Sequence, residues 1–212
     1  RFVRFALYTL KKAGYRSVGH TNGKRMNEPV NFIDIAIEEA KKSLQDGNSG
    51  FGAVIIKEDI LVSKAHDTDS TSKDPTSHAE INALRKASAQ LDGDFTNCML
   101  VSTHEPCPMC STAIVWAGIK KIAFGYSIKD SIAQGRRRIN LTCSELFKRA
   151  GASIEIITDV KKNECSLLYN DQVRKSIKQL RNIDPTELSK LAEELRNKRI
   201  NWFNNQNFQF DK

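Results

Sequence analysis

Two short motifs constrain this chain more than any other feature of its sequence. Residues 78–80 read His-Ala-Glu, and residues 106–110 read Pro-Cys-Pro-Met-Cys. One imidazole and two thiolates form a soft nitrogen and sulfur set that suits tetrahedral zinc. Three protein ligands leave the fourth coordination position open, which is typical of catalytic zinc sites. We therefore expect His78, Cys107 and Cys110 to bind Zn²⁺.

A closed structural zinc site is the alternative, and it requires a fourth protein ligand. His66 and His104 are the candidates for that ligand. Glu80 favours the catalytic interpretation, because a zinc module used only for binding has no need of that carboxylate. Helix positions i and i+2 point about 200° apart, so Glu80 is poorly placed to join His78 as a ligand. We expect Glu80 to be the catalytic residue.

The spacing H-x-E…P-C-x-x-C is the signature of zinc-dependent nucleobase deaminases. Residues 50 to about 168 resemble the cytidine deaminase superfamily, in the branch of guanine deaminases, fungal cytosine deaminases and bacterial tRNA adenosine deaminases. The matching stretches are FGAVI at 51–55, DPTSHAEI at 74–81 and EPCPMC at 105–110. The first and the last of these look most like guanine deaminase.

The resemblance implies a zinc-dependent hydrolytic deaminase that releases ammonia from a small amino-substituted heterocycle. Zinc lowers the pKa of water towards about 7, and Glu80 carries protons from that water to the ring and to the departing amine. We expect a free nucleobase as substrate, guanine before cytosine. A tRNA adenosine deaminase and a deaminase of a nucleoside are the alternatives.

Five residues are expected to contact the substrate: Phe51, Asp67, Ala79, His104 and Trp202. Phe51 corresponds to a pocket aromatic residue that stacks on a planar ring, or else it belongs to the core. His104 stands where relatives have a small or apolar residue, and it either reaches the pocket or is a satisfied core histidine. Trp202 lies in an aromatic segment that resembles the tail closing over the pocket of fungal cytosine deaminases.

Asp67 is where the chain departs from the family. Relatives that act on bases have an Asn eleven positions before the zinc histidine, and that Asn hydrogen-bonds the ring. An ionised Asp only accepts hydrogen bonds, whereas an Asn also donates. We expect Asp67 to help to select the base. The alternative is an ordinary turn residue after a strand.

The expected fold is an α/β class, three-layer α/β/α sandwich with a mixed central sheet of about five strands. Residues 53–57 and 60–65 read as strands joined tightly through Glu58-Asp59, which predicts a hairpin. Helical and strand patterns then alternate, which indicates helices on both faces of a mixed sheet. The predicted helices start at or near 31, 78 and 107, and the later strands cover 98–103, 121–126 and 154–158.

The chain of 212 residues fits one domain with extensions. We predict a basic N-terminal extension over 1–28, a zinc deaminase domain over 29–168, and C-terminal helices with an aromatic tail over 169–212. The net charge of +8 is concentrated at the ends, since residues 1–28 and 174–200 carry most of the excess of Lys and Arg. Nucleic-acid enzymes usually carry basic residues around the site. We therefore expect a small-molecule heterocyclic substrate, and we do not expect nucleic acid as a partner.

The remaining expectations concern location and assembly. No apolar run approaches the roughly 18 residues of a membrane span, so no membrane association is expected. Two of the five cysteines belong to the zinc motif and the other three are scattered, which indicates a reducing compartment and a cytoplasmic location. The family resemblance implies a homodimer formed through the helices that follow the zinc cysteines.

Overall fold

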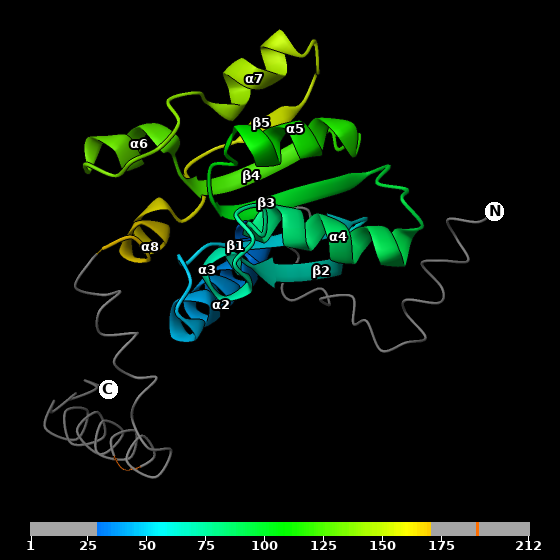
Figure 1. Cartoon of the computed structure of the whole chain (residues 1–212). Coiled ribbons are helices and arrows are strands. Elements are labelled where there is room, and N and C mark those ends of the chain that lie inside the picture. The colour runs from blue at the N-terminus through cyan, green and yellow to red at the C-terminus, as the bar shows by residue number, and fades with distance from the viewer. Residues whose placement is uncertain (1–28, 171–189, 191–212) are drawn as a thin grey trace, which may run out of the picture.

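The computed structural model describes residues 29–170 and residue 190. In this range a five-stranded sheet with the order β2-β1-β3-β4-β5 lies between two layers of helices (Figure 1). The sheet is mixed, because β1 is antiparallel to both of its neighbours while β3, β4 and β5 run parallel. The predicted α/β/α sandwich of about five strands is confirmed.

The first two strands form the predicted hairpin. β1 (Gly52–Lys57) and β2 (Ile60–His66) pair from Lys57 opposite Ile60, so only two residues form the loop. Those residues, Glu58 and Asp59, have φ angles of 49° and 65°. A type I′ turn requires positive φ at both of its central positions, and its twist matches that of the strands.

The parallel half of the sheet contains the crossover that builds the site. β3 (Cys98–His104) is followed by α5 (Pro108–Trp116) and then by β4 (Lys121–Tyr126), which is parallel to β3. Parallel neighbours need such a crossover connection, usually a helix. β5 (Glu155–Ile157) pairs with β4 and completes the sheet.

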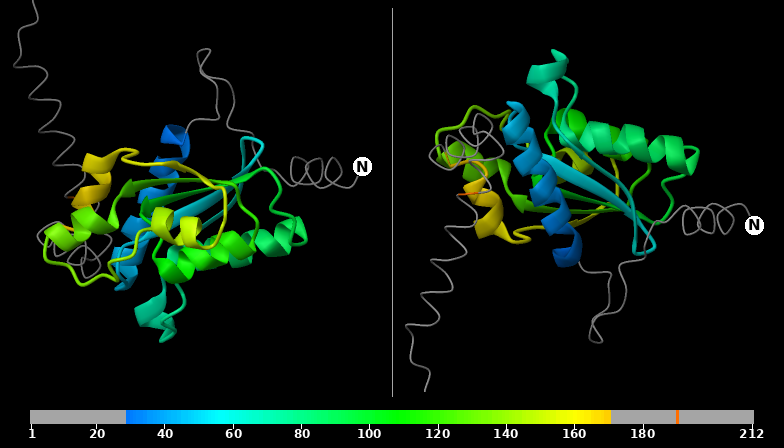
Figure 2. Two further views of the ribbon diagram at one scale, coloured as in Figure 1. Left: turned by 90° about the horizontal axis from the view of Figure 1, so that it is seen from above. Right: turned by 90° about the horizontal axis from the view of Figure 1, so that it is seen from below.

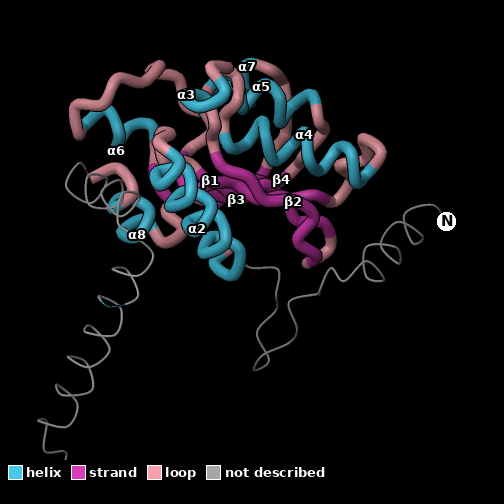
Figure 3. Tube along the Cα trace, turned by 60° about the horizontal axis from the view of Figure 1, so that its bottom comes forward, coloured by secondary structure: helices cyan, strands magenta, loops and turns pink. Residues whose placement is uncertain are grey.

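Each face of the sheet has its own helical layer (Figure 2). α4 (Ala79–Leu91), α5 and α7 (Cys143–Arg149) cover one face, and α2 (Val30–Asp46) and α8 (Lys162–Leu167) cover the other. Figure 3 shows the strands between these layers. The two short helices α3 (Asp69–Ser72) and α6 (Ile128–Ala133) complete the described elements.

Burial on both faces explains the almost unbroken apolar run of β1. Ala53 and Ile55 pack in the cluster on the side of α4, whereas Val54 and Ile56 pack in the cluster on the side of α2. Successive side chains of a strand point to opposite faces, so a strand covered on both sides is apolar at every position.

Gly52 permits the close approach of α2 to β1. A Cβ atom at this position would lie 1.9 Å from the main-chain oxygen of Ala36 and 2.7 Å from the main-chain nitrogen of Ala40. Backbone atoms cannot move aside as the end of a side chain does, so only glycine fits here. This contact anchors the start of β1, and Phe51 precedes it directly.

Parts of the predicted chain lie outside the described residues. These are the extension predicted over 1–28 and, except for Tyr169, Asn170 and residue 190, the C-terminal segment predicted over 169–212. Trp202 is among the residues that are not described. Within the described range, no helix combines the length and the apolar character that crossing a bilayer requires.

Candidate zinc and substrate site

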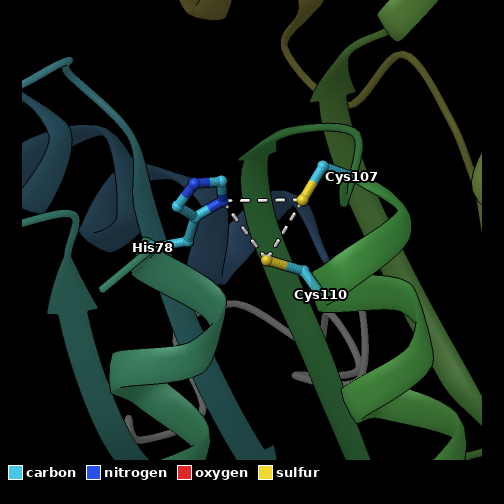
Figure 4. A group of neighbouring side chains, drawn as sticks. All are labelled: His78, Cys107 and Cys110. Carbon is cyan, nitrogen blue, oxygen red and sulfur yellow. Dashed lines mark hydrogen bonds between the residues drawn. The ribbon is translucent and has the colours of Figure 1, made fainter. Parts of the chain in front are cut away.

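The three predicted zinc ligands come from the starts of two helices. His78 is the N-cap residue of α4 and has an extended backbone, with φ −72° and ψ 157°. Cys107 is the N-cap residue of α5, and Cys110 lies in the first turn of that helix. Figure 4 shows His78 facing both cysteines across the space between the two helix starts. The sandwich therefore brings together two motifs that are far apart in the sequence.

The spacing of the ligand atoms fits a tetrahedral zinc ion. His78 Nδ1 lies 3.5 Å from the Sγ atom of Cys107 and 3.5 Å from that of Cys110, and the two sulfurs are 3.6 Å apart. Zinc binds nitrogen at about 2.0–2.1 Å and sulfur at about 2.3 Å. Tetrahedral angles then separate the ligand atoms by about 3.5–3.8 Å. The three side chains fit the ion without rearrangement.

The ionisation of the ligands also suits a cation. The pKa of Cys107 is lowered to about 4, chiefly by its hydrogen bond with Cys110, and the bond with His78 lowers it as well. The pKa of Cys110 is raised by the neighbouring Cys107 sulfur and by burial. The pair therefore loses its first proton from Cys107. Thiolate, not thiol, is the form that binds metal.

No fourth protein ligand joins the group within the described residues. The cluster of possible metal-binding side chains there contains His78, Cys107 and Cys110. His66, one of the two candidates for a closed site, instead contacts Glu39 at 3.0 Å through Nδ1 and Asp46 at 3.4 Å through Nε2. The described geometry therefore favours a site with an open position over a closed structural zinc.

Glu80 lies next to the ligand triangle, in the first turn of α4. Its side chain is buried, and its Oε1 atom accepts a hydrogen bond of 3.0 Å from the hydroxyl of Ser102. Its Oε2 atom lies 3.4 Å from the sulfur of Cys110. Burial raises the pKa of Glu80, and the charge on Cys107 raises it further. A carboxyl group with a raised pKa can both accept and donate a proton near neutral pH.

A cavity of about 200 Å³ opens beside these residues. Two of the predicted ligands, His78 and Cys107, line it together with Glu80, and Phe51 and His104 form another part of its wall. The structure therefore brings five of the predicted site residues to one cavity. The other lining residues are Ser49, Asp69, Glu105, Ile128, Arg138 and Ile139.

Phe51 serves both the cavity and the core. It is half-buried and packs against both hydrophobic clusters while it lines the cavity. The ring of His104 meets it edge-on, with centroids 5.4 Å apart and an interplanar angle of 87°. The guanidinium carbon of Arg138 lies 5.4 Å from the centre of the Phe51 ring, a cation–π contact.

Asp67 is placed differently from our expectation, because its carboxylate bonds to Ser43 and to the loop between α2 and β1. It is 1% exposed and does not line the cavity. Its oxygens accept hydrogen bonds from the hydroxyl of Ser43 at 2.6 Å and from the main-chain N–H groups of Ser49 and Phe51 at 2.8 Å each. Both oxygens thus hold the loop between α2 and β1. Asp67 follows β2 directly and faces that loop, which sequence spacing alone does not reveal.

Ala79 also lies differently from our expectation. Its side chain is fully buried in the cluster on the side of α4 and does not line the cavity. Any contact with a substrate is left to its main-chain N–H, since the first N–H groups of a helix have no partner within it. Trp202 is not among the described residues.

Six of the residues that line the cavity were not predicted as site residues, and Asp69, Arg138 and Ile139 are three of them. Asp69 stands two positions after Asp67, in the first turn of α3, and the polar loop around it gives no reason to choose it. Arg138 and Ile139 belong to a segment about 30 residues beyond the zinc cysteines. The run Arg136-Arg137-Arg138 was the available signal, but such runs are usually solvated surface.

Comparison with known proteins identifies the family of the chain and several of its relatives. Residues 26–126 match the family described as the cytidine and deoxycytidylate deaminase zinc-binding region. The chain is 37% identical to the guanine deaminase of Bacillus subtilis (strain 168) over 106 residues, which are 49% of this chain and 68% of that protein.

A second relative acts on a different substrate class. The chain is 42% identical to the tRNA-specific adenosine deaminase of Aquifex aeolicus (strain VF5) over 94 residues, and this covers 44% of the chain. The match spans 62% of the length of that relative. Among solved structures, a guanine deaminase from Nitrosomonas europaea has the same fold, with a TM-score of 0.57 and 23% identity over 74% of this chain and all of that one.

The first prediction separates metal binding from catalysis. Cys107→Ala or Cys110→Ala removes one of three ligands, so the purified variant should lose most of its zinc. Glu80→Gln leaves the ligands in place and should retain about one equivalent of zinc in elemental analysis while losing turnover by orders of magnitude. A zinc-loaded Glu80→Gln protein with substantial turnover would show that Glu80 is not the proton carrier.

The second prediction concerns Asp67. Asp67→Ala leaves three donors without an acceptor, and each unsatisfied buried group costs about 1–3 kcal/mol, so the free energy of unfolding should fall by roughly 3 kcal/mol or more. Urea denaturation measures this loss. Asp69→Ala, on the half-buried start of α3, is the matched control and should change stability by less than about 1 kcal/mol. A stable Asp67→Asn protein with an altered preference among bases would restore the substrate-contact interpretation.

Proposed function

Because the chain belongs to the cytidine and deoxycytidylate deaminase family, we propose that it is a zinc-dependent hydrolytic deaminase of a small amino-substituted heterocycle. The observation that carries this proposal is the position of Glu80. Its buried carboxyl group lies beside a three-member zinc ligand set and lines the same cavity. A structural zinc site has no need of such a proton carrier, whereas hydrolytic deamination requires one.

The residues divide the chemistry between them. Zinc held by His78, Cys107 and Cys110 would supply Lewis acidity, which lowers the pKa of a coordinated water towards about 7. Ser102 holds the Oε1 atom of Glu80, which leaves Oε2 to receive a proton and to pass it to the heterocycle and then to the departing amine. Phe51 lines the same cavity, so its ring can contact a planar substrate there.

A free nucleobase is the proposed substrate, with guanine before cytosine. The cavity of about 200 Å³ is smaller than the roughly 300–1,000 Å³ of pockets for drug-sized ligands. It therefore suits a ligand of the size of one nucleobase. The similarity to the Bacillus subtilis guanine deaminase supports guanine.

The alternative is deamination of adenosine in a tRNA loop. The similarity to the Aquifex aeolicus protein favours it, and so does the cationic Arg138 in the cavity wall. An extruded base enters a pocket in the same way as a free base. Cavity size therefore does not distinguish a free base from a base in RNA, so the substrate has to be identified by measurement.

The third prediction is that guanine is turned over with little dependence on salt. Ammonia release from guanine, cytosine, adenine and the corresponding nucleosides should be greatest with guanine, and its kcat/KM should stay nearly constant between low and high salt because the base is uncharged. An RNA substrate would instead lose affinity with a log–log slope of about −0.7 for each phosphate contacted. Rapid and salt-sensitive formation of inosine in an anticodon stem-loop, without ammonia release from free bases, would establish the RNA-editing function.

We also propose that the protein is a homodimer, and α5 supplies the support. Trp116, at the end of this helix, is 86% exposed. Exposed tryptophan side chains are enriched at protein interfaces. The fourth prediction is that sedimentation equilibrium gives twice the chain mass and that Trp116→Ser shifts the protein towards the monomer. A parent protein that stays monomeric at micromolar concentration would contradict the proposal.

A further inference from the structure

His104 carries a buried polar atom that no group of the described protein satisfies. The residue is 4% exposed, and its Nε2 atom has no hydrogen-bond partner. Buried polar side-chain atoms almost always have a partner, which is protein, ordered water or ligand. His104 also lines the cavity beside the zinc ligands. A molecule in that cavity is therefore a candidate partner for Nε2, an atom that solvent does not reach.

The rest of the His104 side chain is fixed in place. Its Nδ1 atom lies 2.9 Å from the main-chain oxygen of Glu105. The rings of Phe51, Tyr126 and Tyr169 surround the imidazole, with centroids 5.3–6.0 Å away. The ring is thus held on several sides and cannot turn Nε2 towards another protein group without losing these contacts.

The Nδ1 contact decides which kind of partner Nε2 needs. A carbonyl oxygen only accepts hydrogen bonds, so Nδ1 carries the proton and donates it to Glu105. In a neutral imidazole the second nitrogen is then an acceptor. Burial supports the neutral form, because it lowers the pKa of His104 to about 4. His104 therefore presents an acceptor and requires a donor from the cavity.

We infer that His104 Nε2 accepts a hydrogen bond from a ring N–H of the substrate, and that this contact selects free bases that have such a group. The inference rests on the proposed deaminase function and names the substrate class of that same site. Ser102, which holds Glu80, stands two positions before His104 on β3. Alternate residues of a strand share one face, so the proton carrier and the acceptor address the same substrate.

Ring N–H groups distinguish guanine and cytosine from adenosine. Guanine has ring N–H groups at N1 and N9, and free cytosine has one at N1. The ring nitrogens N1, N3 and N7 of adenosine are all acceptors, and its amino group is the one that leaves. Adenosine thus offers no ring donor to Nε2. A site with a buried hydrogen-bonding group rejects a ligand that leaves this group unpaired far more strongly than an apolar pocket rejects an isostere.

Two variants of His104 test the inference through binding. His104→Phe keeps an aromatic ring in the same packing but removes the acceptor, whereas His104→Gln keeps an acceptor. Each is combined with Glu80→Gln, so that guanine binds to the zinc-loaded full chain without turnover. Calorimetry should give a guanine Kd about 10- to 100-fold weaker for His104→Phe, while the Kd of His104→Gln should stay within about 10-fold of that of Glu80→Gln alone. Binding of 1-methylguanine or 9-methylguanine, whichever lacks the contacted N–H, should be insensitive to His104→Phe.

A second readout needs no change at His104. ¹⁵N NMR of the Glu80→Gln protein should show the proton on Nδ1 of His104 and a shift of the Nε2 resonance when guanine is added. An unchanged Nε2 resonance with guanine bound would overturn the inference. Equal guanine affinities of the Glu80→Gln protein with and without His104→Phe would also overturn it. These results would leave the proposed function standing if the wild-type chain releases ammonia from guanine. Absence of ammonia release from every base and from RNA would instead overturn the proposed function itself.

Discussion

The zinc site requires that three ligand atoms lie within 3.6 Å of one another, and the fold has to meet this distance requirement. His78 is separated from the two cysteines by 29 and 32 positions in the chain. They meet because α4 packs on the hairpin while α5 starts directly after β3, so that both helices begin at the same end of the sheet. The sandwich is thus the scaffold that converts two distant motifs into one site.

Hydrogen-bond partners distinguish Asp67 and Glu105 from Glu80, the proposed proton carrier. Asp67 accepts from the hydroxyl of Ser43 in α2 and from two main-chain N–H groups of the loop that follows it. Glu105 accepts from the main-chain N–H groups of Ile128 and Cys143, which ties the segments after β4 to the end of β3. Glu80, in contrast, has one oxygen held by Ser102, while the other lies beside the metal ligands. A carboxyl group beside metal ligands can exchange a proton with a molecule bound there, whereas one bonded to main-chain N–H groups stabilises the fold.

The same reasoning gives His104 its proposed place in recognition. One of its nitrogens is bonded to the main chain and the other is not, although both are shielded from solvent. An unsatisfied buried acceptor has a free-energy cost in the unliganded protein, and a donor on the substrate removes that cost. Glu80 and His104 would thus divide reaction and recognition between two positions in one cavity, with Phe51 in its wall.

The sequence by itself determined the features that depend on local chemistry. The zinc ligand set, the position of Glu80 and the two-residue hairpin follow from short motifs, and a strict residue spacing carries each of them. Only the tertiary structure decided where Asp67, His104, Asp69 and Arg138 point. Spacing in the sequence is the same whether Asp67 faces the loop or the cavity, and the packing of α2 against β1 is what turns it to the loop. Arg138 reaches the cavity because the chain folds back after β4, and no local pattern encodes that return.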